Sequence, residues 1–205
     1  MSAQSPTGEV RRALLAPERV TTREEALDRP SPVPAAPGVY AWYFDRAPAG
    51  VPLAGTSETE FGHLLYVGIS PKGAPDQRQP ADTSRQSLRT RIRYHFRGNA
   101  AGSTLRLTLG SLLAEEIGVE LRRVGSGARF TFGVGEAAIS DWMAEHARVC
   151  WFVDDTPWIS ESRLISELVL PLNLDQNRHS GFHTELSKAR RTQRDQARAL
   201  PIVPR

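Results

Sequence analysis

The pattern of apolar and polar positions along the chain predicts three short strands. Apolar runs rich in aromatic and β-branched residues cover 37–44, 63–70 and 149–153. Each run is too short for a helix, and Gly or Pro bounds the first two, as is common for strands. We therefore expect one small sheet, mixed or antiparallel, built from these three strands.

Apolar residues that recur every three to four positions predict the helices that flank this sheet. In 88–97, for example, Leu88, Ile92 and Phe96 form one apolar stripe. The expected fold is α/β (α+β), with a small three-stranded central sheet, flanking helices and an inserted block of helices and a hairpin. The predicted helices cover 9–16, 88–97, 105–113, 136–146 and 157–170, with a short one capped by Thr22 and Glu25, and the predicted hairpin covers 119–134.

Composition divides the chain into three parts. Residues 1–36 are rich in Pro, Ala and Arg and are expected to form an extended lead-in to the first strand. Residues 37–177 are expected to form the folded domain, and 178–205 a basic C-terminal tail. Two stretches inside the domain, 45–62 and 71–87, are expected to be surface loops because Gly, Pro and polar residues dominate them.

The overall composition is that of one globular domain of 205 residues, with 40% hydrophobic and 24% charged residues. No apolar run reaches the length of a membrane span, and the N-terminus has no signal-like apolar segment, so we expect no membrane partner and a cytoplasmic location. The single cysteine, Cys150, excludes an intramolecular disulfide and a cysteine-rich zinc site. The formal net charge of +3 is a mild excess that suits phosphate but does not require it.

The predicted helix 88–97 carries the first polar residues that are candidates for a functional site. Arg91 and His95 are four residues apart, at one edge of the apolar stripe, where a cation and an imidazole could share one anionic group. The other edge carries a basic ridge, which could contact nucleic acid or simply be solvated. That ridge consists of Arg89, Arg93 and Arg97.

The predicted helix 157–170 carries an unexpected carboxylate. Glu161 lies on the same helical face as the apolar residues Leu164 and Ile165. An ionised carboxylate on a buried face costs several kcal/mol unless a cation or strong donors meet it, so we expect a metal ion or an arginine beside it. The alternative is a frayed first turn that leaves Glu161 in water.

The basic tail supports two interpretations. Its cations, including Lys188, Arg190 and Arg191, could bind phosphates of a nucleic acid or could coat an exposed helix. His179 and His183 have the spacing of helical metal ligands, but no cysteine or third ligand lies near them in the sequence, so a zinc site is not favoured.

Taken together, these motifs resemble the GIY-YIG nucleases in kind, order and spacing. The quoted motifs are Gly38-Val39-Tyr40, Tyr66-Val67-Gly68, Leu88-x-x-Arg91-Ile92-x-x-His95 and Glu161-x-x-Leu164-Ile165 followed by Pro171-Leu172-Asn173. The resemblance covers 38–173. It is interrupted by the loops and by the block 105–146, which is long for a minimal domain of this kind.

The resemblance implies a metal-dependent endonuclease that hydrolyses phosphodiester bonds in DNA, with RNA not excluded. Glu161 would hold one Mg²⁺ or Mn²⁺, and Arg91 would bind the scissile phosphate. Either Tyr40 or Tyr66 would take the proton from the attacking water, with His95 assisting, and the sequence does not decide between the two tyrosines. The last of these site residues, Asn173, would orient its neighbours.

Two other interpretations stay open: a catalytically silent nucleic-acid-binding module on the same fold, and a structural or partner-binding protein whose arginines are only solvated. A nuclease site requires the hydroxyls of Tyr40 and Tyr66, Arg91, His95 and Glu161 to converge on one cleft. Glu161 on the opposite side of the sheet from Tyr40 would contradict the nuclease interpretation.

Overall fold

A four-stranded antiparallel sheet forms the centre of the computed structural model, which describes residues 6–73 and 86–204. The strand order is β2–β3–β1–β6. The three predicted strands are confirmed as β1 (Gly38–Phe44), β3 (Gly62–Ser70) and β6 (Ala147–Val153). The predicted number of three was wrong, because a two-residue strand, β2 (Glu58–Thr59), pairs with the start of β3 and is too short to leave a pattern in the sequence.

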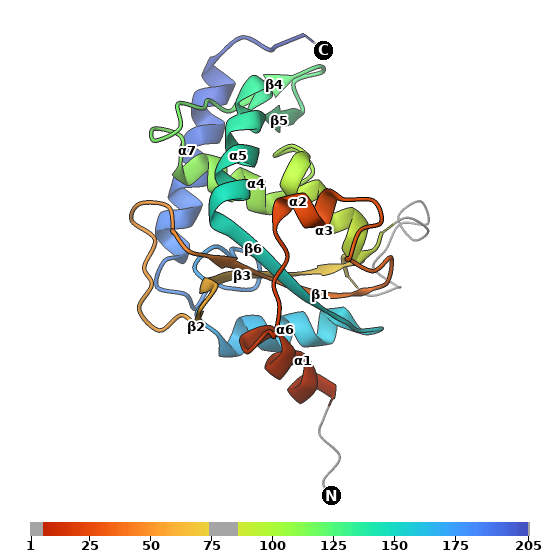
Figure 1. Ribbon diagram of the computed structural model, residues 1–205. Helices are drawn as coiled ribbons and strands as arrows, with labels where there is room; N and C mark the ends of the chain where they lie inside the picture. Colours follow the sequence, from red (N-terminus) through yellow and green to blue (C-terminus); the bar gives the residue numbers. More distant parts are fainter. Residues whose placement is uncertain (1–5, 74–85, 205) are drawn as a thin grey trace, which may run out of the picture.

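The two faces of the sheet bury two separate apolar clusters. On one face, Tyr40, Trp42 and Phe44 of β1 pack against α3 (Leu88–Arg97), α4 (Thr104–Leu112) and α5 (Glu136–His146). The alternate residues of β1 face α1 (Pro6–Leu15) and α6 (Pro157–Glu167), which lie below the sheet in Figure 1. The molecule therefore has three layers, and consecutive residues of β1 serve opposite layers.

Side-chain caps mark the starts of two helices, and the first of these caps was predicted. Thr22 and Glu25 form a capping box at the start of α2 (Arg23–Leu27). At the start of α3, Ser87 accepts a hydrogen bond from the Thr90 backbone N–H. The helix α6 ends at Glu167, three residues earlier than predicted, and most of the predicted loop 71–87 lies outside the described residues.

The inserted block and the C-terminal segment pack together. After α4 come β4 (Arg122–Val124), β5 (Arg129–Thr131), the 3-10 turn η3 (Gly133–Gly135) and α5. The last helix, α7 (His183–Ala199), rises at the left of Figure 1 and contacts α4. Leu186, Arg190 and Ala197 of α7 are buried, so this helix is part of the folded structure rather than a solvated tail.

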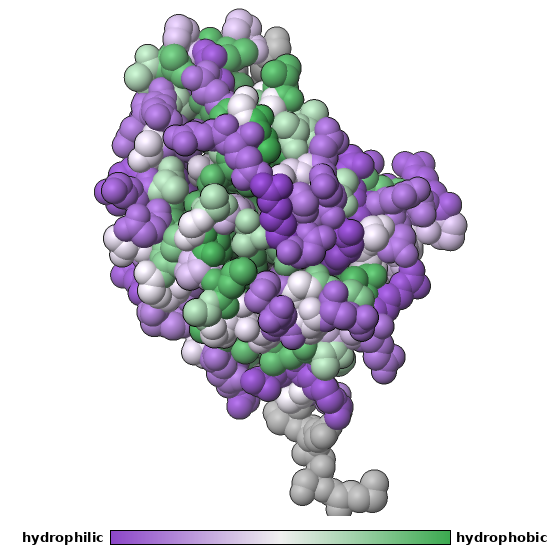
Figure 2. Space-filling view, turned by 60° about the vertical axis from the view of Figure 1, so that its left-hand side comes forward, coloured by the Kyte–Doolittle hydropathy of each residue, from purple (hydrophilic) through white to green (hydrophobic). Residues whose placement is uncertain are grey.

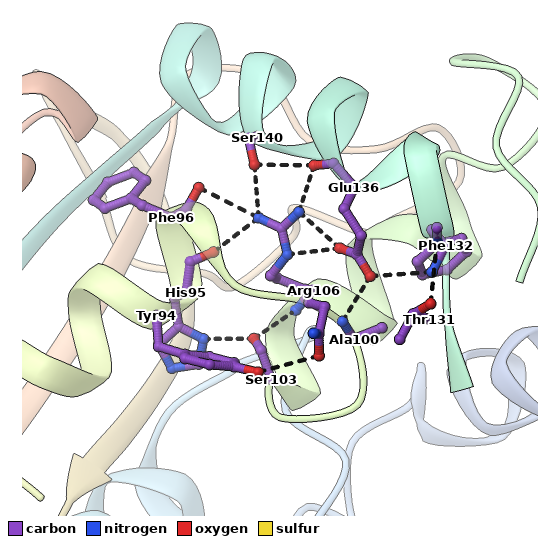
Figure 3. A network of polar contacts seen from close by, with 12 residues as sticks. Tyr94, His95, Phe96, Ala100, Ser103, Arg106, Thr131, Phe132, Glu136 and Ser140 are labelled. Carbon is purple, nitrogen blue, oxygen red and sulfur yellow. Dashed lines mark hydrogen bonds and ion pairs between the residues drawn. The ribbon is translucent and has the colours of Figure 1, made fainter. Parts of the chain in front are cut away.

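A fully buried arginine, Arg106, joins three helices of this layer (Figure 3). Its Nε donates to Glu136 Oε2 over 2.9 Å, and its Nη1 donates to the carbonyl oxygens of His95 and Phe96 and to Ser140 Oγ. Its Nη2 completes the ion pair with Glu136, 2.7 Å away. Every nitrogen of the guanidinium therefore has a partner, which is the condition for burying a charge.

Replacing Arg106 by Ala should destabilise the protein by about 3–5 kcal/mol, because the partly buried Glu136 carboxylate would lose its counter-charge. Thermal or urea unfolding of the variant measures this loss. Arg163→Ala is the matched control: Arg163 forms an exposed ion pair with Glu167, so its loss should change stability by less than about 1 kcal/mol. Equal melting of the two variants would show that the network in Figure 3 contributes little.

The surface is mainly hydrophilic on the face that Figure 2 shows, with apolar residues visible in a band across the middle. Helices long and apolar enough to cross a membrane are absent from the described part of the chain.

Candidate active site

A cavity of about 80 Å³ lies where β1 and β3 meet residues of α3, α6 and α7. Liquid water occupies about 30 Å³ per molecule, so this cavity has room for a few waters or one small anion. Five of the six residues predicted from the sequence line it, and the sixth, His95, lies behind one of them. The five are Tyr40, Tyr66, Arg91, Glu161 and Asn173.

Gly68 allows residues from both layers to reach this cavity. Helix α6 packs on the opposite face of the sheet from Tyr40, which could have kept Glu161 away from it. Tyr40 pairs with Gly68 across β1 and β3, and its ring lies over that glycine: a Cβ on Gly68 would be 2.5 Å from the Tyr40 hydroxyl. The missing side chain leaves room for the phenol, so Tyr40 and Glu161 line the same cavity.

The Glu161 carboxylate has neither a hydrogen bond nor an ion pair with any described residue. It belongs to the second turn of α6, inside the helix, so the first turn has not frayed to release it. Burial, reinforced by Asp175, raises its pKa to about 7, although Lys72 and Arg91 act in the opposite direction. The carboxylate therefore lies partly buried on the apolar side of α6, and a cation beside it stays a prediction.

The oxygen atoms around Glu161 suit a hard divalent cation. Asp175 lines the same cavity, as does the Tyr66 side chain. Within 6–73 and 86–204 there is no cluster of three or more His, Cys, Asp or Glu that could hold a metal. The residues therefore fit Mg²⁺ or Mn²⁺ held by one or two carboxylates and completed by water and phosphate oxygens, an arrangement that magnesium commonly adopts.

A chain of hydrogen bonds runs from the cavity into the protein through Tyr40. The Tyr40 hydroxyl lies 2.8 Å from His95 Nε2, and His95 Nδ1 lies 2.7 Å from Ser103 Oγ. His95 is fully buried, and burial, together with Arg91 and Arg106, lowers its pKa well below the usual range. The imidazole is therefore neutral and able to accept a hydrogen bond from the phenol.

Arg91 bridges Tyr40 and the loop that precedes α4. Its Nε donates to the Tyr40 hydroxyl over 3.4 Å, and its Nη1 donates to the Gly102 carbonyl over 2.8 Å. These contacts fix the guanidinium at the cavity wall and leave its Nη2 N–H groups without a protein acceptor within the described structure.

Tyr66 and Asn173 have different partners. The Tyr66 hydroxyl lies 3.2 Å from Thr104 Oγ1. The Asn173 amide accepts from the Val67 N–H and donates to the Val67 carbonyl, both over 2.9 Å. These two bonds fix the turn after α6 to β3, as expected for an asparagine that orients its neighbours.

The predicted nucleic-acid contacts lie in different places. On α3, Arg89 and Arg93 donate to the Val33 and Leu27 carbonyls of the N-terminal lead-in, whereas Arg97 is exposed. On α7, Lys188 and Arg191 are exposed, whereas Arg190 is buried and lines the cavity.

Sequence reasoning missed three residues of the site: Lys72, Asp175 and Ser103. Lys72 and Asp175 lie in irregular segments, where no periodicity indicates the direction of a side chain. Ser103 caps the start of α4, and the same Oγ also contacts His95. Its proximity to His95 depends on a tertiary contact between α3 and the start of α4.

The comparison with protein families agrees with the motifs and the fold. The GIY-YIG catalytic domain matches residues 38–192, which is more than half of the chain. The chain therefore belongs to the GIY-YIG catalytic domain family, whose members are nucleases that act on DNA and generally use divalent metals. No curated protein and no solved structure matches the chain.

Proposed function

We propose that this protein is a divalent-metal-dependent endonuclease that hydrolyses phosphodiester bonds in DNA. The observation that carries the proposal is the Glu161 carboxylate, which is partly buried and unpaired in the same cavity as Arg91 and the Tyr40 phenol. A binding module has no use for such a carboxylate, because it repels phosphate unless a cation lies between them.

Glu161 would hold the Mg²⁺ or Mn²⁺, and Asp175, which lines the same cavity, would orient water beside it. When bound, the cation stabilises charge on the phosphate and on the departing oxygen. Arg91 binds the scissile phosphate with the Nη2 N–H groups that its contacts to Tyr40 and Gly102 leave available. Lys188 and Arg191 bind phosphates further along the strand, so they contribute to affinity and to its salt dependence.

Tyr40 serves as the general base, in preference to Tyr66. Burial raises the pKa of Tyr40, and Arg91 offsets only part of this, so a free phenolate does not form at neutral pH. Instead, Tyr40 accepts a proton from the attacking water as its own proton moves to His95 Nε2, 2.8 Å away. The negative phosphate balances the charge that His95 gains. Tyr66 has no such acceptor, since its hydroxyl faces Thr104.

Supercoiled plasmid incubated with the purified protein and Mg²⁺ or Mn²⁺ should be nicked and linearised, and EDTA should prevent this. Ca²⁺ should support binding better than cleavage, because its larger and looser coordination shell positions the attacking water less well. DNA binding without cleavage under any of these cations would instead support the catalytically silent module, and the absence of both would support a structural protein.

A further inference from the structure

Helix α7 brings a second guanidinium into the cavity. Arg190 is only 8% exposed, and it lines the same cavity as Tyr66, Arg91 and Glu161. Its neighbours in the basic run, Lys188 and Arg191, are exposed. Arg190 therefore differs from the other cations of this helix in its surroundings, although nothing in the sequence distinguishes it from them.

Among the residues that the structure describes, the Arg190 guanidinium has no protein partner. Its Nε is fully buried and has no hydrogen bond. Across the described residues, its other nitrogens form no hydrogen bond or ion pair either. Asp175 lines the same cavity but does not pair with it, and burial, reinforced by Arg194, lowers the pKa of Arg190 while Asp175 and Tyr66 act in the opposite direction.

Arg106 shows how this protein buries an arginine for structural purposes. All three nitrogens of Arg106 have partners, including the Glu136 carboxylate. A buried cation without partners costs several kcal/mol, so Arg190 fits a site whose anion arrives from outside. The contrast between these two buried arginines indicates that Arg190 is present for a ligand.

We propose that Arg190 binds the scissile phosphate together with Arg91, which makes α7 part of the active site. This inference rests on the proposed function and assigns one more catalytic residue to it. Arg91 already uses its Nε and Nη1 on Tyr40 and Gly102. The two terminal nitrogens of the Arg190 guanidinium have no acceptor among the described residues, and this end of the planar fork matches two phosphate oxygens.

The two arginines act mainly in the transition state. A phosphodiester carries one negative charge, and attack by a deprotonated water adds a second charge to the phosphoryl oxygens. Glu161 and Asp175 bring negative charge to the same cavity, so a bound metal together with Lys72 and Arg91 would have to offset both carboxylates and the phosphate. A second guanidinium, already oriented and shielded from water, stabilises the added charge without reorganisation.

Arg190→Met tests this proposal, because methionine keeps the apolar stem and removes the charge. Its cleavage rate in single-turnover assays with saturating protein should fall about 10²–10³-fold, the usual effect of removing one such donor. Its melting temperature should stay equal or rise, because no protein contact is lost. Arg190→Lys should recover only part of the rate, since an ammonium cannot form the bidentate contact.

Arg129→Met is the matched control, because it removes one exposed arginine from the β4–β5 hairpin. It should cleave like wild type. Wild-type cleavage by Arg190→Met would refute the role of Arg190 while leaving the nuclease proposal intact, provided that Glu161→Gln is inactive. A much lower melting temperature for Arg190→Met would show a structural role and also overturn the inference.

Inorganic phosphate gives a readout that does not depend on cleavage. Phosphate should raise the melting temperature of the wild-type protein relative to chloride at equal ionic strength, and Arg190→Met should lose most of this shift. If phosphate stabilises both proteins equally, Arg190 does not bind it. This result would decide the inference even for a protein that cleaves no DNA.

Discussion

Replacing Glu161 by Gln is expected to abolish metal-dependent cleavage while the protein stays folded and still binds DNA. The amide keeps the volume of the side chain but removes the charge that holds the cation, so the cleavage rate should fall by about 10³-fold or more. DNA affinity in EDTA should change little. The measurements are a cleavage assay with Mg²⁺ and Mn²⁺, Mn²⁺ binding by calorimetry, and DNA binding by fluorescence anisotropy.

The pH dependence of stability separates this role from a structural one. The pKa of Glu161 is about 7 in the folded protein and about 4.3 in an unfolded chain. Between these values the folded state binds more protons, so the free energy of unfolding falls as pH rises, by at most about 4 kcal/mol at this site. The glutamine variant has no carboxyl group to ionise at this position, so its free energy of unfolding should not fall in this way as pH rises. Melts in EDTA should therefore show Glu161→Gln equal to wild type near pH 4 and equal or more stable at pH 8.

A glutamine variant that cleaves like wild type would show that Glu161 is not the metal ligand. A variant that melts far lower at every pH would show instead that the carboxylate is a structural partner. Arg163→Ala, on the same helix but exposed, is the control for any effect of mutating α6.

The sequence predicted the helices best where the apolar periodicity is strong. The predicted limits of α3 and α5 are the observed ones, and the buried residues include Leu88 and Ile92 of α3 and Ile139 and Met143 of α5. The end of α6 was less predictable, since apolar residues continue through Leu168 and Leu170 after the helix has ended. Those two residues still pack in the core beside α6. Their apolar side chains therefore indicate that the segment is buried, not that the helix continues.

The sequence did not predict the role of residues whose partners lie far away along the chain. The spacing of Arg91 and His95 indicated a shared site, but the bond between His95 and Tyr40 joins residues 55 positions apart. Likewise, one basic run contains Lys188, Arg190 and Arg191, and only the packing of α7 against α4 buries the second of them. A helical pattern identifies a buried face, but it does not show which neighbour covers that face.

Replacing Tyr40 by Phe is expected to reduce the cleavage rate far more than replacing Tyr66 by Phe. The first change removes the hydroxyl that joins the attacking water to His95, so we expect a loss of about 10²–10⁴-fold, the range for a general base. The second removes a hydroxyl that contacts Thr104, and its loss should be about tenfold or less. Single-turnover cleavage of one duplex at saturating protein and Mg²⁺ measures both rates.

Stability provides the internal control for this comparison. Tyr40→Phe loses the bonds to His95 and Arg91, and Tyr66→Phe loses the bond to Thr104, so we expect a destabilisation of about 1–3 kcal/mol for the first variant and about 1 kcal/mol for the second. A large difference in cleavage rate between two variants that are both folded at the assay temperature therefore reflects chemistry rather than packing. If Tyr66→Phe is the slower enzyme, Tyr66 is the base, and the Tyr40–His95–Ser103 chain only positions Arg91 through its Nε contact with the Tyr40 hydroxyl.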